Sequence, residues 1–336
     1  MKITTKARIR SYCIVFIVLF LIAAAYLYQS SSKGNKTPIT DTQFALNTAV
    51  TITLYDTQDT SILDGAFNLC RQYENVFSRT LEGSELYQLN HSDKKTFTLS
   101  AELASLISTG LTYSSLSNGA FDISIAPISQ LWDFTSDNPV VPSTTDIQAN
   151  LPYVGYQNFT LNSTTLTRAN IHNELDLGAI AKGYIADRIK DYLLFHNVRS
   201  AVINLGGNIL CVGDKHGTPF TIGVQTPFED HTKTIATLQI TDRSIVTSGI
   251  YERYFMQDSK LYHHILDPKT GYSYDNDLIA VTILSDESVI GDALSTTCFA
   301  LGYEKALTYL NSLTDVDAIL ITTDNQLHYT NNFPKE

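Results

Sequence analysis

The sequence predicts an α+β fold, preceded by one membrane-spanning segment. Along the 336 residues, stretches with helical spacing and stretches with strand-like alternation follow one another without a regular strand–helix–strand order. This order favours α+β over a doubly wound parallel sheet. Hydrophobic residues make up 43% of the chain, which is enough for a sizeable core. The formal net charge is −11, and we expect no nucleic-acid partner because such a partner needs a basic surface.

The N-terminal segment carries the membrane prediction. Residues 11–32 contain no charged side chain, and an apolar run of this length can span a bilayer. We therefore divide the chain into two parts. Residues 1–40 contain a cytoplasmic stub, a transmembrane anchor or signal segment and a linker, and residues 41–332 form a domain. The segment is expected to cross a bacterial cell membrane once, with the domain outside the cytoplasm. The alternative for the apolar run is a buried core helix. The basic residues that should keep the stub in the cytoplasm are Lys2, Lys6, Arg8 and Arg10.

The first half of the domain is predicted to contain a strand, two helices and a hairpin. Residues 44–56 alternate between apolar and polar side chains, as a strand does. Residues 61–77 place apolar side chains at helical spacing, and residues 100–119 form a second helical pattern that ends at a glycine. Two short runs over 159–168 predict a hairpin.

The second half is predicted to begin with a helix over 179–197 and to continue mainly in strands. The strand-like runs are 200–213, 220–227, 234–249 and 278–285. Residues 247–255 and 261–271 should form a hairpin that leads into a turn. Two helices and a last hairpin close the chain, over 291–302, 303–313 and 318–330.

The cysteines of the domain are predicted to be small apolar core residues. Cys70, Cys211 and Cys298 lie far apart in the sequence and show no metal-binding spacing. One disulfide with a leftover thiol is the alternative.

The stretch GDALSTTCFALG, residues 291–302, raises a chemical question. It has the composition of a core helix, yet Asp292 and Thr296 lie four residues apart and so project from one face of that helix. A carboxylate and a hydroxyl at this spacing supply half of a site for a hard cation such as Mg²⁺, which prefers oxygen ligands. The alternative is that Asp292 caps or bridges to a neighbouring element.

A second candidate lies in ELDLGAIAKGYIADRI, residues 174–189. An extended stretch ends near Asp176, and a helix is expected to begin at about Gly178, which places Lys182 near free backbone N–H groups. This arrangement suits an anion, and the alternative is an ordinary helix start with a solvated lysine. Gly183 inside the helix indicates close approach of another element, because glycine there costs about 1 kcal/mol relative to alanine.

Three further segments are candidates for contact with a ligand. The glycine pair that begins at Gly206 lies inside a strand pattern, which indicates a bulge or a close backbone approach. Phe121 and Asp122 either lie against a flat ligand or form a buried turn with a capping aspartate. His263 and His264 alternate sides of a strand, so only one can face a given site, as a general base or as a structural histidine.

Taken together and in order, these pieces resemble the ApbE family, the FAD:protein FMN transferases. The resemblance runs from about Phe44 to the last hairpin. Each segment alone is a weak indication, whereas nine in the family's order are specific. They are FSRTLEGSELYQLN, GAFDISIAPISQLW, YVGYQNF, ELDLGAIAKGYIADR, NLGGNI, IGVQTP, VTSGIYERYF, HHILDPKTG and GDALSTTCFALG.

The resemblance implies a two-lobed α+β fold with FAD between the lobes. It also implies a Mg²⁺ ion held by Asp292, Thr296 and the backbone carbonyl of Ala179. His264 matches the family's proposed base, which deprotonates a threonine hydroxyl of a secreted or membrane acceptor protein. That hydroxyl attacks the FMN-side phosphorus of FAD, Mg²⁺ stabilises the charge on the diphosphate, and AMP leaves. The residues that match flavin-nucleotide contacts are Ala120, Phe121, Asp122, Asp176, Lys182 and Ile265.

Two expected FAD contacts depart from the family's pattern. Asn47 stands where the family usually has glycine, and Thr80 stands where it usually has a tyrosine that stacks on the flavin. Such stacking is worth about 1–3 kcal/mol for a base on an aromatic ring, so its loss would weaken FAD binding unless Tyr87 or Phe121 replaces it. Two alternatives to the transferase stay open: a Mg²⁺-dependent FAD pyrophosphatase that gives FMN and AMP, as some relatives are, and a flavin-binding protein without turnover.

Overall fold

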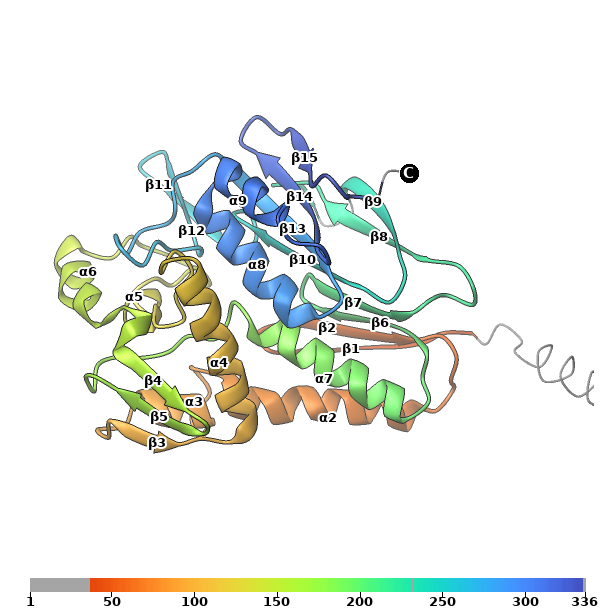
Figure 1. Cartoon of the computed structure of the whole chain (residues 1–336), viewed down its shortest axis with the longest axis horizontal. Helices are drawn as coiled ribbons and strands as arrows, with labels where there is room; N and C mark the ends of the chain where they lie inside the picture. The colour runs from red at the N-terminus through yellow and green to blue at the C-terminus, as the bar shows by residue number, and fades with distance from the viewer. Residues whose placement is uncertain (1–36, 231–232, 335–336) are drawn as a thin grey trace, which may run out of the picture.

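The computed structural model describes residues 37–230 and 233–334 (Figure 1). The predicted membrane segment over residues 11–32 lies outside this part of the chain. Within it, no helix is both long and apolar enough to cross a bilayer. Helices pack on antiparallel sheets in these residues, which confirms the predicted α+β class.

An eight-stranded sheet forms the centre of the molecule, in the order β1-β2-β6-β7-β10-β13-β14-β15. All of its neighbouring strands are antiparallel. Every side chain of β13 is buried, which explains why its sequence, LIAVTILS, is almost entirely apolar. The strands are β1 (Ile39–Ala45), β2 (Thr48–Leu54), β6 (Ser200–Leu205), β7 (Asn208–Gly213), β10 (Ser244–Gly249), β13 (Leu278–Ser285), β14 (Asp317–Thr322) and β15 (Leu327–Tyr329).

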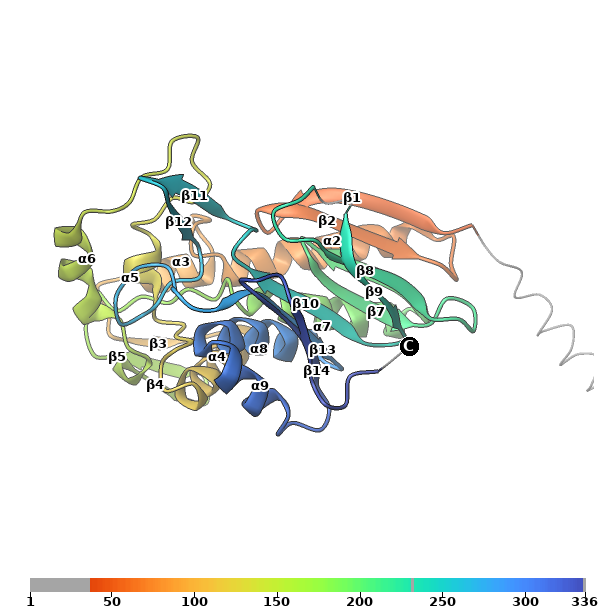
Figure 2. The same ribbon diagram turned by 90° about the horizontal axis from the view of Figure 1, so that it is seen from above.

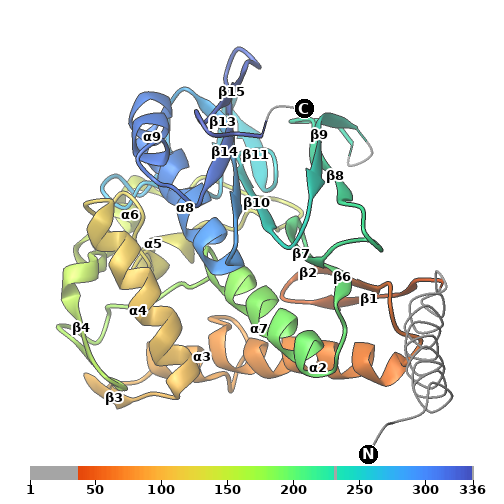
Figure 3. The same ribbon diagram turned by 45° about the vertical axis from the view of Figure 1, so that its right-hand side comes forward.

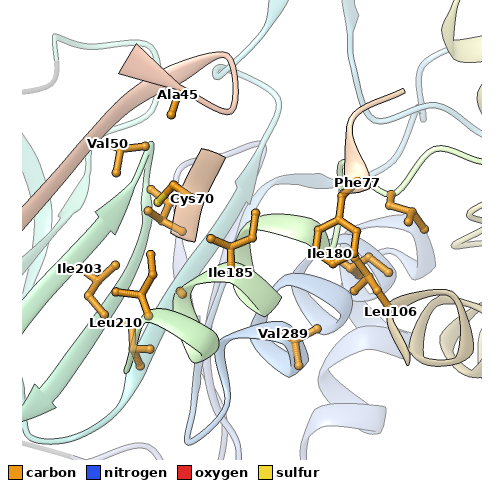
Figure 4. Packing of buried hydrophobic residues seen from close by; sticks show 14 of the residues in the cluster. Ala45, Val50, Cys70, Phe77, Leu106, Ile180, Ile185, Ile203, Leu210 and Val289 are labelled. Atoms are coloured by element: carbon orange, nitrogen blue, oxygen red, sulfur yellow. The ribbon is translucent and has the colours of Figure 1, made fainter. Parts of the chain in front are cut away.

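Four helices cover one side of this sheet, as Figure 3 shows. They are α2 (Thr60–Phe77), α7 (Ala181–Phe195), α8 (Ser288–Leu301) and α9 (Tyr303–Leu310). The main core lies between sheet and helices, where Ile203 of β6 and Leu210 of β7 face Cys70 of α2 and Ile185 of α7 (Figure 4). The domain's three cysteines are free and buried, as predicted.

A smaller three-stranded sheet, in the order β3-β5-β4, lies beside α3 and α4 (Figure 1). Arg168, the last residue of β5, is fully buried. Its guanidinium donates to the backbone carbonyls of Ser92, Lys94 and Asn173, so it ties the sheet to two loops. The elements here are α3 (Glu85–Asn90), β3 (Thr96–Thr98), α4 (Ala101–Leu116), β4 (Phe159–Asn162) and β5 (Thr165–Arg168).

Two separate hairpins, β8–β9 and β11–β12, complete the sheets of the described residues. Figure 2 shows β11 and β12 at the end of the molecule that carries α5 and α6, and Phe255 of β11 packs there with Ile128 and Ile147. The remaining elements are α5 (Ala126–Ser129), α6 (Thr144–Asn150), η1 (Leu151–Tyr153), η2 (Tyr156–Asn158), β8 (Phe220–Gln225), β9 (Thr234–Ile240), β11 (Tyr254–Gln257) and β12 (Lys260–His263).

The structure corrects three local predictions. Residues 44–56 are not one strand but belong to the β1–β2 hairpin, whose turn residues Leu46 and Asn47 have φ of 54° and 56°. The glycine pair that begins at Gly206 is the two-residue turn between β6 and β7, and not a bulge within one strand, although the close approach considered for it is found between Gly206 and the side chain of Thr48. The run 234–249 is divided between β9 and β10, which belong to different sheets.

Candidate functional site

The start of α8 is held against α7. Asp187 of α7 accepts the backbone N–H of Ser288 at 2.8 Å and that of Val289 at 2.9 Å, and so caps α8 from the neighbouring helix. A Cβ placed on Gly183 of α7 would lie 2.3 Å from the carbonyl oxygen of Ser288. The close approach predicted from Gly183 is therefore confirmed, although α7 begins at Ala181, later than expected.

Asp292 lies one turn into α8 and is only 5% exposed. One carboxylate oxygen accepts the backbone N–H of Gly183 at 2.5 Å, and the other accepts the side-chain amide of Asn208 at 2.9 Å. Burial raises the pKa of Asp292, while the charge of Lys182 and these two donors counteract the rise. The question raised by the sequence thus has an answer: the carboxylate connects α8 to α7 and to β7.

The residues predicted to hold a magnesium ion supply oxygen atoms of the kind that this ion prefers. The N–H of Gly183, four residues after Ala179, is donated to Asp292 and not back to the carbonyl of Ala179. The hydroxyl of Thr296 lies 3.1 Å from that of Ser248 on β10. Within the described residues, no group of three or more His, Cys, Asp and Glu side chains could hold a metal ion. The donor set, with one carboxylate, one hydroxyl and one carbonyl, fits Mg²⁺ better than a transition metal.

Lys182 is surrounded by titratable groups. Its ammonium lies 3.5 Å from the carbonyl oxygen of Gly206. Its charge opposes the rise that desolvation causes in the pKa values of Asp292 and Glu252, and adds to the fall that desolvation causes in the pKa of His264. Glu252 was not predicted as a site residue, because a lone glutamate in TSGIYERYF resembles a solvated surface side chain. It has exposed surface, yet the surrounding protein desolvates it enough to raise its pKa to about 7. A strongly shifted pKa among charged neighbours makes Glu252 a candidate functional residue.

The two neighbouring histidines occupy different environments, as their alternation predicts. His263 is buried, its Nε2 lies 2.9 Å from the carbonyl oxygen of Tyr274, and its ring packs edge-on against Phe299. His264 follows β12 and is half-buried, and its Nδ1 has no hydrogen-bond partner among the described residues. Desolvation, assisted by the charge of Arg253, lowers the pKa of His264 to about 3, so its imidazole is neutral. His263 is a structural residue, and His264 lies among the charged groups near Lys182.

Asp176 belongs to a second polar group. Its carboxylate forms an ion pair with Arg79 at 2.9 Å and accepts hydrogen bonds from the hydroxyl of Ser129 and the backbone N–H of Gly178. Its own backbone N–H donates to the carbonyl of Ile123 at 2.8 Å. The segment around residue 123 is therefore held directly beside Asp176.

In the segment before Ile123 the side chains are turned inward. Asp122 accepts hydrogen bonds from Ser124 and from the backbone N–H of Tyr156, which is the buried capping arrangement considered for it. Phe121 is 4% exposed and belongs to the main core, so its ring is not available to replace a stacking tyrosine. The carbonyl of Ala120 accepts the Tyr274 hydroxyl at 2.8 Å.

Ile265 completes the set of predicted contacts, together with Asn47 and Thr80, the two positions that differ from the family's usual residues. Ile265 is buried, and its backbone N–H donates to Nδ1 of His263 at 3.3 Å. Asn47 is exposed in the β1–β2 turn. Thr80 is exposed and follows Arg79, the partner of Asp176. Tyr87, considered as a substitute for the missing tyrosine, stacks on His91 at 3.9 Å between ring centroids.

Comparison with known proteins identifies the family of this chain. A model of the ApbE family matches residues 46–320. The FAD:protein FMN transferase of Klebsiella pneumoniae (strain 342) is 38% identical, over 84% of this chain and 88% of its own length. That of Treponema pallidum (strain Nichols) is 33% identical, over 79% of this chain and 78% of its own length. Among solved structures, the ApbE protein of Thermotoga maritima is 29% identical with a TM-score of 0.80, over 88% of this chain and 98% of its own. The flavin transferase ApbE of Vibrio cholerae, at 23% identity, has the same TM-score and coverage. The chain therefore belongs to the ApbE family and is a transferase.

Proposed function

We propose that this chain transfers FMN from FAD to a threonine hydroxyl of acceptor proteins, in a Mg²⁺-dependent reaction that releases AMP. One observation carries the proposal: Asp292 is buried, both of its carboxylate oxygens are held by donors, and the charge of Lys182 acts on it. A buried carboxylate beside a lysine, close to other groups with shifted pKa values, is typical of a functional site. The names of the relatives support flavin transfer from FAD.

The chain's own residues suit the steps of this reaction. His264 is neutral because of its low pKa, so its imidazole can accept the proton of the attacking hydroxyl. The hydroxyl oxygen bonds to the FMN-side phosphorus, the bond from that phosphorus to the bridging oxygen breaks, and AMP leaves with the electron pair. Lys182 supplies positive charge beside Asp292, where the diphosphate of FAD would bind.

Asp292, Thr296 and the carbonyl of Ala179 would hold the magnesium ion. When bound, Mg²⁺ neutralises charge on the diphosphate. Its proposed ligands come from α8 and from the residues just before α7, and the Gly183–Asp292 hydrogen bond joins α8 to the first turn of α7. This bond keeps the carboxylate beside the turn that carries Ala179.

We further propose that the reaction takes place outside the cytoplasm, next to the membrane. The support is the uncharged run over residues 11–32 and the basic residues before it. The acceptors would then be secreted or membrane proteins that carry a target threonine.

The test uses the purified protein, FAD and Mg²⁺, with and without an acceptor domain that a related FAD:protein FMN transferase modifies. AMP release and the intact mass of the acceptor are measured together. A mass gain equal to FMN, in step with AMP, supports the transferase. AMP and free FMN without any mass gain would indicate a pyrophosphatase, and no AMP at all would leave only flavin binding.

A further inference from the structure

Three large apolar side chains are exposed on the protein surface next to Glu252. Phe228, in the loop after β8, is 46% exposed, and Tyr254 and Met256 of β11 are 40% and 58% exposed. The ring of Phe228 contacts that of Tyr254 edge-on at 5.4 Å between centroids, and that of Tyr251 at 6.0 Å. We refer to Phe228, Tyr254 and Met256 as the aromatic rim. Neighbouring exposed apolar side chains can mark an interaction site, whereas single scattered ones are normal on a protein surface.

The backbone conformation of Phe228 is strained, and packing of its side chain in the core does not account for this strain. Its φ is 60°, in the left-handed region that a bulky side chain rarely adopts. Such a conformation costs on the order of 1–3 kcal/mol. Because nearly half of the ring remains in solvent, burial of the ring returns only part of this cost. Strain held at an exposed aromatic residue favours a binding role.

The strand that carries the other two side chains has an edge without a partner strand. Among the residues that the structure describes, β11 pairs only with β12. Phe255, between Tyr254 and Met256, is turned inward and packs with Trp132, which fixes β11 to the domain. Tyr254 and Met256 therefore share the outward face, beside a row of backbone groups that an extended polypeptide can pair with.

We propose that the aromatic rim is the surface on which the acceptor polypeptide docks, as an extended segment with apolar side chains beside its threonine. This inference rests on the proposed function. Continuity with the site selects the occupant: Tyr251, whose ring contacts that of Phe228, directly precedes Glu252, and the charges of Lys182 and Asp292 act on Glu252. A polypeptide docked on the aromatic rim therefore lies beside a residue of the candidate site.

The test compares rim variants with a matched exposed residue elsewhere. Phe228→Gly removes the ring and relieves the positive φ, so loss of folding does not explain its effect. Met256→Ser shortens the outward face of β11. Phe195→Ser is the control, because Phe195 is 82% exposed at the end of α7. With FAD, Mg²⁺ and the acceptor domain named above, each rim variant should raise the KM for the acceptor at least about fivefold, with kcat unchanged.

The outcomes separate this inference from the proposed function. A KM for the acceptor that stays unchanged in both rim variants would overturn the docking surface while FMN transfer stands. A rise in the KM for FAD would also overturn it, because the rim would then contact the flavin. Absence of any acceptor mass gain with the unaltered protein would reject the proposed function, and the docking surface with it.

Discussion

At the residue scale, burial determines what a carboxylate can do. Asp292 exchanges the solvation of water for two protein donors and a nearby lysine, which counteract the rise that burial causes in its pKa and hold the carboxyl group at a defined position. Asp122 is buried to a similar degree, but its oxygens are used to close a turn. The sequence presents both as aspartates in apolar surroundings, and only the structure separates their roles.

Replacement of Asp292 by Asn should abolish most of the activity. The side chain keeps its size while its negative charge is lost, so AMP release with FAD and Mg²⁺ should fall at least about 100-fold. The measurement is AMP release across a range of Mg²⁺ concentrations, with thermal unfolding in parallel. Asp317→Asn is the matched control, since Asp317 is also buried but pairs with Arg243. Equal AMP release from Asp292→Asn and the unaltered chain would reject the metal assignment.

The buried His263 should make stability depend on pH. Desolvation lowers its pKa to about 4, against about 6.5 in an unfolded chain. As the pH falls, the native state therefore binds this proton at a lower pH than the unfolded state does. Its contribution is complete above about pH 6.5 and is lost as pH falls toward 4, with about 2 kcal/mol lost between about pH 7.5 and about pH 5. Urea unfolding at these two pH values should show a smaller loss for His263→Gln. An identical loss would mean that His263 does not titrate in this way.

At the element scale, the contact between α7 and α8 positions the candidate site. Alanine in place of a helical glycine normally stabilises a helix by about 1 kcal/mol. At Gly183 the sign should reverse, because a Cβ would press on the backbone of Ser288 and Val289. We expect Gly183→Ala to destabilise the protein by about 2 kcal/mol and to reduce AMP release, since α8 carries Asp292.

A second glycine provides the control for this prediction. At Gly65 of α2 a Cβ would meet the hydroxyl end of Tyr192, a side chain that can move aside. Gly65→Ala should therefore change the midpoint of urea unfolding and the rate of AMP release much less. If Gly183→Ala proves as stable and as active as the unaltered chain, the backbone contact does not hold the site in place.

The long helices could be predicted because their apolar periodicity reflects burial of one face, and the buried strand β13 because its run of apolar residues reflects burial of both faces. The turns were harder. Leu46 adopts a positive φ, which is not expected of a leucine. The alternating residues on both sides of it therefore resemble one continuous strand. The placement of Asp292 and Thr296 four residues apart on one helix could be predicted from the helical pattern, whereas their role as metal ligands is implied by the family resemblance and stays a prediction. Glu252 could not, because its pKa is set by desolvation in the folded chain and by the charges of Lys182 and Asp292, which are distant in sequence.

At the scale of the whole molecule, the candidate site combines segments from most of the domain. The group around Lys182 draws on α7, α8, the β6–β7 turn and the residue after β12. The group around Asp176 adds residues that follow α2 and residues of α5. All of these segments lie between residues 37 and 334, and so does the family match. The chemistry should therefore be independent of the predicted membrane segment.

Removal of residues 1–36 tests this independence. The full chain should sediment with membranes and require detergent, because residues 11–32 can span a bilayer. The shortened chain should stay in the supernatant and release AMP from FAD at a rate within about twofold of the detergent-solubilised full chain, since none of the site residues is removed. Sedimentation of both forms, followed by the AMP assay on each fraction, is the measurement. If the shortened chain still sedimented with membranes, another part of the protein would be responsible for attachment; if it lost activity, the N-terminal residues would contribute to the site or to its stability.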